Sequence, residues 1–347
     1  MKKKILFATA LMAVAMAMPA YAEDADNVAT LADTTPQVTK HFVMAEGLAV
    51  PAETFSFTAT AVTSDAPAAT IAEVDYNTEY SLGEATEGKY TLDTYADITF
   101  GTFPHAGMYE YTVKETAGND NAITYDTAEY KLRVYVVNED DGSLKVQTVT
   151  AEKDNEKQSE IGFTNTYRKN ASLTISKSTV GSMSDKTKDF AFTITFTKSG
   201  TEDASVTSYT GKIGTEDVVC NVGTATTFYL HDGESLVFDE LPVGTRYVVT
   251  EAAAADGYKP SVSVVENGVQ NATLTANDAD ALSSASSGLT NLVGENENSA
   301  TFTNTYDDIP VTGLVLNNLP AVMLIAISAV ALVLLYAVFF FRLDFNG

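Results

Sequence analysis

The sequence predicts an all-β protein built from two tandem β-sandwich domains. Short runs rich in β-branched and aromatic residues follow one another through most of the 347 residues, and clusters of turn-forming residues separate them. Between these runs, no stretch has the period of a convincing amphipathic helix. The two halves also share polar landmarks at a nearly constant spacing, which is the pattern of a duplicated domain. Short strands between turns favour a sandwich in each half.

The N-terminus has the order of regions found in a secretory signal peptide. Lys2 to Lys4 precede an apolar run that ends at Ala20-Tyr21-Ala22, which matches a basic region, an apolar region and an A-x-A cleavage site. We therefore expect residues 1–22 to be removed on export. Residues 23–37 are small and polar without a hydrophobic period, and they are expected to form a flexible leader.

Residues 38–167 and 172–306 are the two predicted domains. The runs with strand character in the first are 54–60, 97–100, 109–113, 130–136 and 144–149, and in the second 173–175, 190–196, 227–230, 235–238, 247–250 and 261–265. The segment 279–298, rich in Ser, Asn, Gly and Ala, is expected to be a loop inside the second domain, because a strand at Phe302 must still follow it.

Three landmarks show that the second domain repeats the first. Their spacings are 137, 136 and 139 residues, and they pair Val38-Thr-Lys40 with Ile175-Ser-Lys177, Tyr111-Thr-Val-Lys-Glu115 with Tyr247-Val-Val-Thr-Glu251, and Phe163-Thr-Asn-Thr-Tyr167 with Phe302-Thr-Asn-Thr-Tyr306. Polar residues that keep one spacing while their surroundings differ indicate a duplicated unit.

The C-terminal end contains a short motif ahead of an apolar segment. Residues 307–318 include Ile309, Pro310, Val311, Thr312 and Gly313, residues 319–341 carry no charge, and residues 342–347 form a short tail. The 23 apolar residues would span roughly 34 Å as a helix, enough to cross a membrane. This order resembles a cell-wall sorting signal of the LPxTG type, with Ile309 in place of the usual leucine. The resemblance implies that a sortase attacks the Thr312 carbonyl and releases Gly313 with the helix.

Composition excludes several classes of function. The formal net charge of −25 argues against binding to nucleic acid or to anionic membranes. Cys220 is the only cysteine, so it is expected to be free and buried, and no intramolecular disulfide can stabilise the exported chain. His41, His105 and His231 lie apart without metal-ligand spacing, and no nucleophile elbow or phosphate-binding loop is present. We therefore expect no enzymatic turnover, metal or cofactor.

A lysine, a glutamate and an asparagine recur in the same order in each half. The lysine lies in the first strand, the glutamate ends a middle strand and the asparagine lies in the last strand; the sets are Lys40, Glu115 and Asn165, and Lys177, Glu251 and Asn304. The first and last strands of a sandwich can be neighbours, so the three side chains can converge in the core. Burial without reaction would be costly, which suggests that they react with one another.

The chemistry expected of such a set is an amide exchange. Burial lowers the pKa of a lysine and raises that of a glutamate. The neutral amine would attack the asparagine carboxamide, while the protonated glutamate polarises the amide oxygen and shuttles protons so that ammonia leaves. The resulting isopeptide bond would join the first strand to the last and restrict the unfolded chain as a disulfide does.

At these residues the exported chain resembles streptococcal-type pilin domains and the related B-type repeats of collagen adhesins, the CnaB type. The motifs are Gly107-x-Tyr109-x-Tyr111 leading to Glu115, Tyr125-Asp-x-x-x-Tyr130, Leu241-Pro-Val-Gly244 leading to Glu251, and the two Phe-Thr-Asn-Thr-Tyr endings. The resemblance implies two Ig-like sandwiches with spontaneous isopeptide bonds, Lys40 to Asn165 with Glu115 as the catalytic acid and Lys177 to Asn304 with Glu251.

The resemblance implies a structural protein on the cell wall of a Gram-positive bacterium, and a pilin subunit in the first instance. Its partners would be a sortase and either peptidoglycan or other pilin subunits. Lys153 and Lys157, in the predicted loop before the last strand of the first domain, are candidate acceptors for the Thr312 acyl group of another subunit. The alternative is a monomeric wall-anchored adhesin that binds a host ligand through its loops, and the sequence leaves this open.

Overall fold

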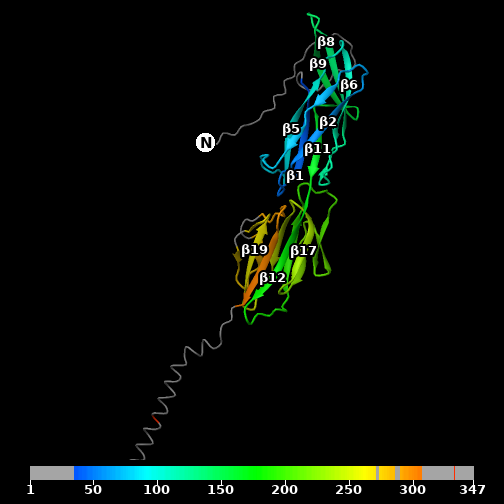
Figure 1. Cartoon of the computed structure of the whole chain (residues 1–347). Coiled ribbons are helices and arrows are strands. Elements are labelled where there is room, and N and C mark those ends of the chain that lie inside the picture. Colours follow the sequence, from blue (N-terminus) through cyan, green and yellow to red (C-terminus); the bar gives the residue numbers. More distant parts are fainter. Residues whose placement is uncertain (1–34, 271–272, 286–289, 307–331, 333–347) are drawn as a thin grey trace, which may run out of the picture.

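The computed structural model describes residues 35–270, 273–285, 290–306 and 332. From residue 35 to residue 306, every regular element in these ranges is a strand, which confirms the predicted all-β class (Figure 1). The predicted signal peptide, most of the predicted leader, the predicted sorting motif and all of the predicted membrane segment except Leu332 lie outside the described residues. Within the described ranges, no helix is both long and apolar enough to cross a membrane.

The first domain is made of two facing sheets. The five-stranded sheet has the order β3 (Ala69–Ile71), β5 (Lys89–Phe100), β1 (Gln37–Ala45), β11 (Ile161–Tyr167) and β7 (Ile123–Thr124). The six-stranded sheet has the order β10 (Glu156–Gln158), β9 (Leu144–Lys153), β8 (Glu129–Asn138), β6 (Gly107–Thr116), β2 (Glu53–Ala61) and β4 (Val74–Tyr76). The first and last long strands, β1 and β11, are neighbours and run parallel, with Lys40 opposite Phe163 and Phe42 opposite Asn165.

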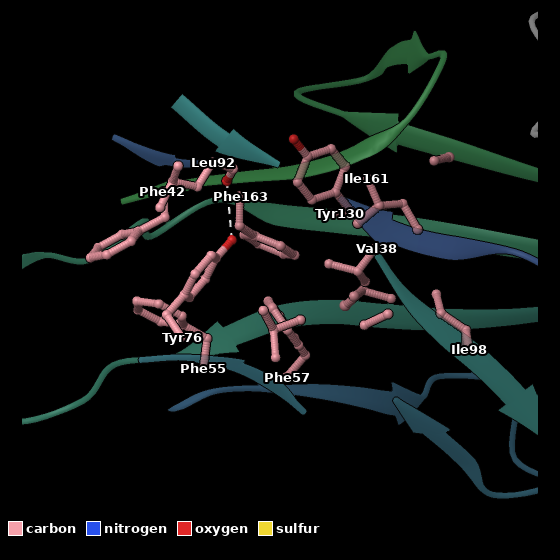
Figure 2. Packing of buried hydrophobic residues seen from close by; sticks show 14 of the residues in the cluster. Val38, Phe42, Phe55, Phe57, Tyr76, Leu92, Ile98, Tyr130, Ile161 and Phe163 are labelled. Atoms are coloured by element: carbon pink, nitrogen blue, oxygen red, sulfur yellow. Dashed lines mark hydrogen bonds between the residues drawn. The ribbon is translucent and has the colours of Figure 1, made fainter. Parts of the chain in front are cut away.

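Alternation along the strands builds the core of this domain. In β8 and β11 nearly every second side chain is buried, as expected for strands with one face on a core. Figure 2 shows the aromatic part of the core, where Phe42 packs against Phe55 and Tyr76 with ring centroids 5.2 and 5.1 Å apart. The Tyr76 hydroxyl donates a hydrogen bond of 3.0 Å to the Leu92 carbonyl, so this polar group is satisfied inside the core.

The second domain follows the same plan with a larger first sheet. Its eight strands are ordered β15 (Glu216–Asn221), β14 (Ser208–Ile213), β17 (Ser235–Pro242), β12 (Asn170–Val180), β23 (Ser299–Tyr306), β19 (Tyr258–Glu266) and β20 (Val269–Gln270), with β21 (Leu274–Thr275) also paired to β19. The facing sheet is ordered β16 (Thr226–Leu230), β13 (Phe190–Thr197), β18 (Arg246–Glu251) and β22 (Leu282–Ser283). Again the first and last strands, β12 and β23, are parallel neighbours.

Two sequence expectations for this domain can be compared with the structure. Cys220 is free and completely buried in β15, as expected. The segment 279–298 does lie within the second domain, but its described part is more ordered than a loop, because β22 pairs with β18 and Val293 enters the core.

The two sandwiches are stacked end to end, and β11 leads into β12 through only Arg168 and Lys169 (Figure 1). At the junction the Arg246 guanidinium lies 2.7 Å from the Glu46 carboxylate. The Glu295 side chain accepts hydrogen bonds from the Ala49 amide, at 3.1 Å, and from the Lys169 ammonium.

The backbones of the two domains also approach each other closely. Gly244 has a φ of +93°, and a Cβ atom there would lie 2.9 Å from the Cβ of Ala45. Val243, from the same turn, is packed into the core cluster of the first domain. A junction that combines apolar packing, ion pairs and a tight turn restrains the hinge between the domains.

We expect Glu295→Ala to loosen the junction, because it removes the acceptor for both Ala49 and Lys169, worth about 1 to 2 kcal/mol at a half-buried site. Single-molecule energy transfer between dyes on the two domains should show a broader distance distribution than in the wild type. Glu297→Ala, an exposed carboxylate in the same segment, is the matched control. Identical distributions for Glu295→Ala and the wild type would show that these contacts do not restrain the junction.

Candidate isopeptide sites

The first site joins three strands of the first domain. Lys40 projects from β1, Glu115 from the end of β6 and Asn165 from β11, so the two sheets contribute to one cluster. The Lys40 Nζ donates to Glu115 Oε2 at 2.6 Å, and Asn165 Nδ2 donates to Glu115 Oε1. The side chains of Lys40 and Glu115 are both completely inaccessible to solvent, and Asn165 is equally buried. The structure therefore brings together the three residues that the sequence selected.

The amide oxygen of Asn165 faces a backbone donor rather than Glu115. It accepts a hydrogen bond of 2.8 Å from the Asp126 backbone N–H. Sequence reasoning expected the glutamate to polarise this oxygen, and that expectation does not match the geometry. The Glu115 carboxylate instead contacts the Lys40 Nζ and the Asn165 Nδ2, because it lies between β1 and β11 and both of these nitrogens are hydrogen-bond donors.

The second site has the same three residue types in the second domain. Lys177 lies in β12, Glu251 at the end of β18 and Asn304 in β23. Glu251 Oε1 lies 3.0 Å from Lys177 Nζ and accepts a 2.6 Å hydrogen bond from Asn304 Nδ2. The side chains of Lys177 and Glu251 are completely buried. Within the described part of the chain, Lys177 Nζ, Glu251 Oε2 and Asn304 Oδ1 have no hydrogen-bond partner, so this site is less completely satisfied than the first.

Each lysine amine also lies over an aromatic ring. Lys40 Nζ is 4.4 Å from the centre of the Phe55 ring, and Lys177 Nζ is 4.3 Å from that of Phe190. The rings exclude water from the amines on one side, while the sheets exclude it on the others. Sequence reasoning missed both phenylalanines as members of the sites, although each lies near the start of the strand that follows the lysine strand.

Burial changes the proton affinities of these groups in opposite directions. Loss of solvation lowers the pKa of Lys40 from 10.5 to about 8, although contact with Glu115 opposes the shift. The pKa of Lys177 is lowered to about 8 for the same reason, with Glu251 opposing. Burial raises the pKa of Glu115 and of Glu251 above 4.5. The amine and the carboxylate at each site therefore have closer proton affinities than in water, which favours transfer of a proton between them.

The remaining candidates lie elsewhere. Lys153 ends β9 and Lys157 lies in β10. These strands form a hairpin, so the two lysines flank a tight turn and not the predicted loop. The turn residues Asp154 and Asn155 both adopt the positive φ that tight hairpins need. Lys157 is exposed, whereas Lys153 is half-buried with its Nζ 5.6 Å from the Tyr130 ring. The sorting residues Ile309 to Gly313 lie outside the described residues.

Two family models match the chain. Residues 36–168 match the Spy0128-like isopeptide containing domain, and residues 171–306 match a domain of unknown function, DUF7601. A pilin from Streptococcus pyogenes serotype M1 is 31% identical over 178 residues, which are 50% of this chain and 51% of the pilin. The pilus tip adhesin Cpa of Streptococcus pyogenes is 41% identical over 91 residues, or 26% of this chain and 13% of the adhesin.

Solved structures give a looser match. The major pilin protein T3.2 from Streptococcus pyogenes serotype GAS13637 is 23% identical, with 81% of this chain and 99% of that chain covered and a TM-score of 0.37. The chain spans about half the length of the curated pilin that it matches. The first domain is therefore similar to the Spy0128-like isopeptide containing domain, and the chain is homologous to a streptococcal pilin over about half of its length.

Proposed function

We propose that the protein is a pilin subunit of a Gram-positive cell surface, stabilised by one autocatalytic isopeptide bond in each domain. The observation that carries the proposal is the buried contact of a lysine, a glutamate and an asparagine at both sites, with the amine and the amide nitrogen on the same carboxylate. The homology to streptococcal pilins supports the same function.

In the proposed reaction, the neutral Lys40 amine attacks the Cγ atom of Asn165. Glu115 accepts the proton that Nζ loses and passes it to Nδ2, because its two oxygens already contact these two atoms. The Nζ–Cγ bond forms, the Cγ–Nδ2 bond breaks and ammonia leaves. Lys177, Glu251 and Asn304 would undergo the same overall exchange, with the single oxygen Oε1 of Glu251 facing both nitrogens. Neither reaction turns over, so the protein is a structural protein and not an enzyme.

The two bonds would give the stability that disulfides cannot give here. Each closes a loop of about 125 residues, which in the chain-entropy description is worth on the order of 5 kcal/mol. Both would join strands that are already paired, β1 with β11 and β12 with β23. The first and last strands of each domain could then not separate without breaking a covalent bond.

Assembly is the second part of the proposal. A sortase would cleave after Thr312 and transfer its acyl group to a lysine of another subunit or to peptidoglycan. Exposed Lys157 is the better placed of the two acceptor candidates, because Lys153 is half-buried. The similarity to a pilus tip adhesin supports a second candidate function, a wall-anchored adhesin that binds a host ligand.

The isopeptide bonds can be tested by the intact mass of residues 23–312. Two bonds should lower the mass by about 34 Da, one ammonia of about 17 Da for each. Glu115→Ala and Glu251→Ala should each restore about 17 Da, and Glu129→Ala, an exposed carboxylate, should restore none. A folded protein of full calculated mass would rule out the crosslinks.

The rate of bond formation should depend on pH through the lysine. A protonated amine has no free electron pair, so the rate in the first domain should rise with pH and level off above about 8, the pKa to which burial lowers that of Lys40. Unreacted chain refolded from denaturant at pH 6 to 9.5 and quenched in acid would give this profile by mass spectrometry. A rate that is still rising steeply at pH 9.5 would mean that the amine reacts while still exposed to water, where its pKa is near 10.5.

Assembly can be tested in cells by immunoblotting wall extracts. The wild type should give a ladder that resists detergent, and Thr312→Ala should abolish it. Lys157→Arg should remove the ladder if this lysine is the acceptor, with Lys145→Arg, in the exposed Lys145–Glu139 ion pair, as the control. A single wall-linked band in the wild type would favour the monomeric adhesin.

A further inference from the structure

One feature of the first site has no counterpart in the second. The Asn165 amide oxygen accepts the Asp126 backbone N–H at 2.8 Å, whereas the corresponding oxygen of Asn304 has no partner among the described residues. The two sites therefore differ at the atom on which negative charge develops when an amine attacks the amide carbon.

The side chain of Asp126 holds this donor in place. Its carboxylate accepts the backbone N–H groups of Ala128, at 2.8 Å, and of Thr164, at 2.7 Å. Thr164 is the neighbour of Asn165 in β11, so the bond fastens the loop to the strand that carries the reacting amide. Asp126 is thus bound both to its own turn and to the site.

Two tyrosines of the Tyr125-Asp-x-x-x-Tyr130 motif fix the loop at its flanks. The Tyr125 hydroxyl donates to Glu53 Oε1 at 2.8 Å, and the Tyr130 hydroxyl donates to the Gly162 carbonyl at 2.7 Å. Glu53 begins β2 and Gly162 lies in β11, so the loop is tied to both sheets. A donor held this rigidly needs little rearrangement as charge develops, which is what makes such donors effective.

We infer that the Asp126 N–H serves as the oxyanion donor for isopeptide formation in the first domain, and that the Asp126 carboxylate is the positioning group for it. The inference rests on the proposed function. As Lys40 Nζ bonds to Asn165 Cγ, the carbonyl electrons move to Oδ1, and the hydrogen bond from the Asp126 N–H stabilises the negative charge that develops there. The C=O bond is restored when Nδ2 leaves as ammonia, with the proton that Glu115 takes from Nζ. No other reactant is needed.

The consequence is a difference in rate between the two domains of one molecule. Removal of a single oxyanion donor from an enzyme lowers the rate on the order of 100-fold or more. The isopeptide bond of the first domain should therefore form faster than that of the second by at least about tenfold, even though each lysine amine lies over a phenylalanine ring.

The test follows both bonds in the same refolding reaction. Residues 23–312 are unfolded before reaction, diluted into buffer and quenched at intervals, and the two joined peptides are quantified by mass spectrometry after digestion. Asp126→Ala should slow formation of the Lys40–Asn165 bond by about 10- to 100-fold and leave the rate of the Lys177–Asn304 bond unchanged. Asp126→Asn keeps an acceptor oxygen for only one of the two N–H groups, those of Ala128 and Thr164, and should recover only part of the rate. Asp140→Ala, an exposed aspartate in the turn between β8 and β9, should have no effect.

Circular dichroism during refolding separates slow bond formation from slow folding. If Asp126→Ala folds and forms the Lys40–Asn165 bond at the wild-type rates, the inference is wrong. If that variant does not fold, the test is the comparison of the two bond-formation rates in the wild-type protein. Equal rates in the two domains would also overturn the inference. Absence of both bonds in the folded wild type would refute the proposed function itself, which is a different result.

Discussion

The structure depends on the burial of a lysine and a glutamate between two apolar sheets. A charge in such a place costs several kcal/mol unless it is paired, and here each pair lies beneath a phenylalanine ring and beside an asparagine. The fold keeps these groups together through the strands that carry them, because β1 with β11, and β12 with β23, are hydrogen-bonded neighbours. Reaction between the groups would replace an expensive ion pair with a neutral amide, so the unfavourable burial itself favours the bond.

Parallel pairing of the first and last strands is what makes this possible in both domains. In an antiparallel hairpin the paired residues are close in sequence, whereas Lys40 and Asn165 lie at opposite ends of their domain. The glutamate comes from the facing sheet, at the end of β6 or β18, and so reaches across the core to both strands. Each site is therefore formed only when both sheets have closed, which would make the bond a late event in folding that fixes the native state.

Much of the fold could be predicted from the sequence, and so could the three residues of each site. Alternating burial in strands such as β8 and β13 follows from a period of two in the sequence, and the repetition of lysine, glutamate and asparagine selected the residues that cluster in each core. Strands of two or three residues such as β7 and β22 are too short to show a period, and their pairing with β11 and β18 places them. The contact of the Asp126 N–H with Asn165 could not be predicted, because a backbone donor in a loop leaves no mark in residue type.

The positions of the two bonds decide how the chain would carry tension. A pull between the leader and the C-terminus would pass from Lys40 directly to Asn165, through Arg168 and Lys169 to Lys177, and from there to Asn304. Most of both sandwiches would lie outside this covalent path and bear no load. At the junction this path is the backbone of Arg168 and Lys169. Only the angle between the domains would depend on non-covalent contacts, among them the ion pairs of Glu46 and Glu295. Tension entering through Lys157 would reach Asn165 along β11, with the bond to Lys40 holding that strand in its sheet. In either case the weakest element under force is the angle between the domains, not the domains themselves.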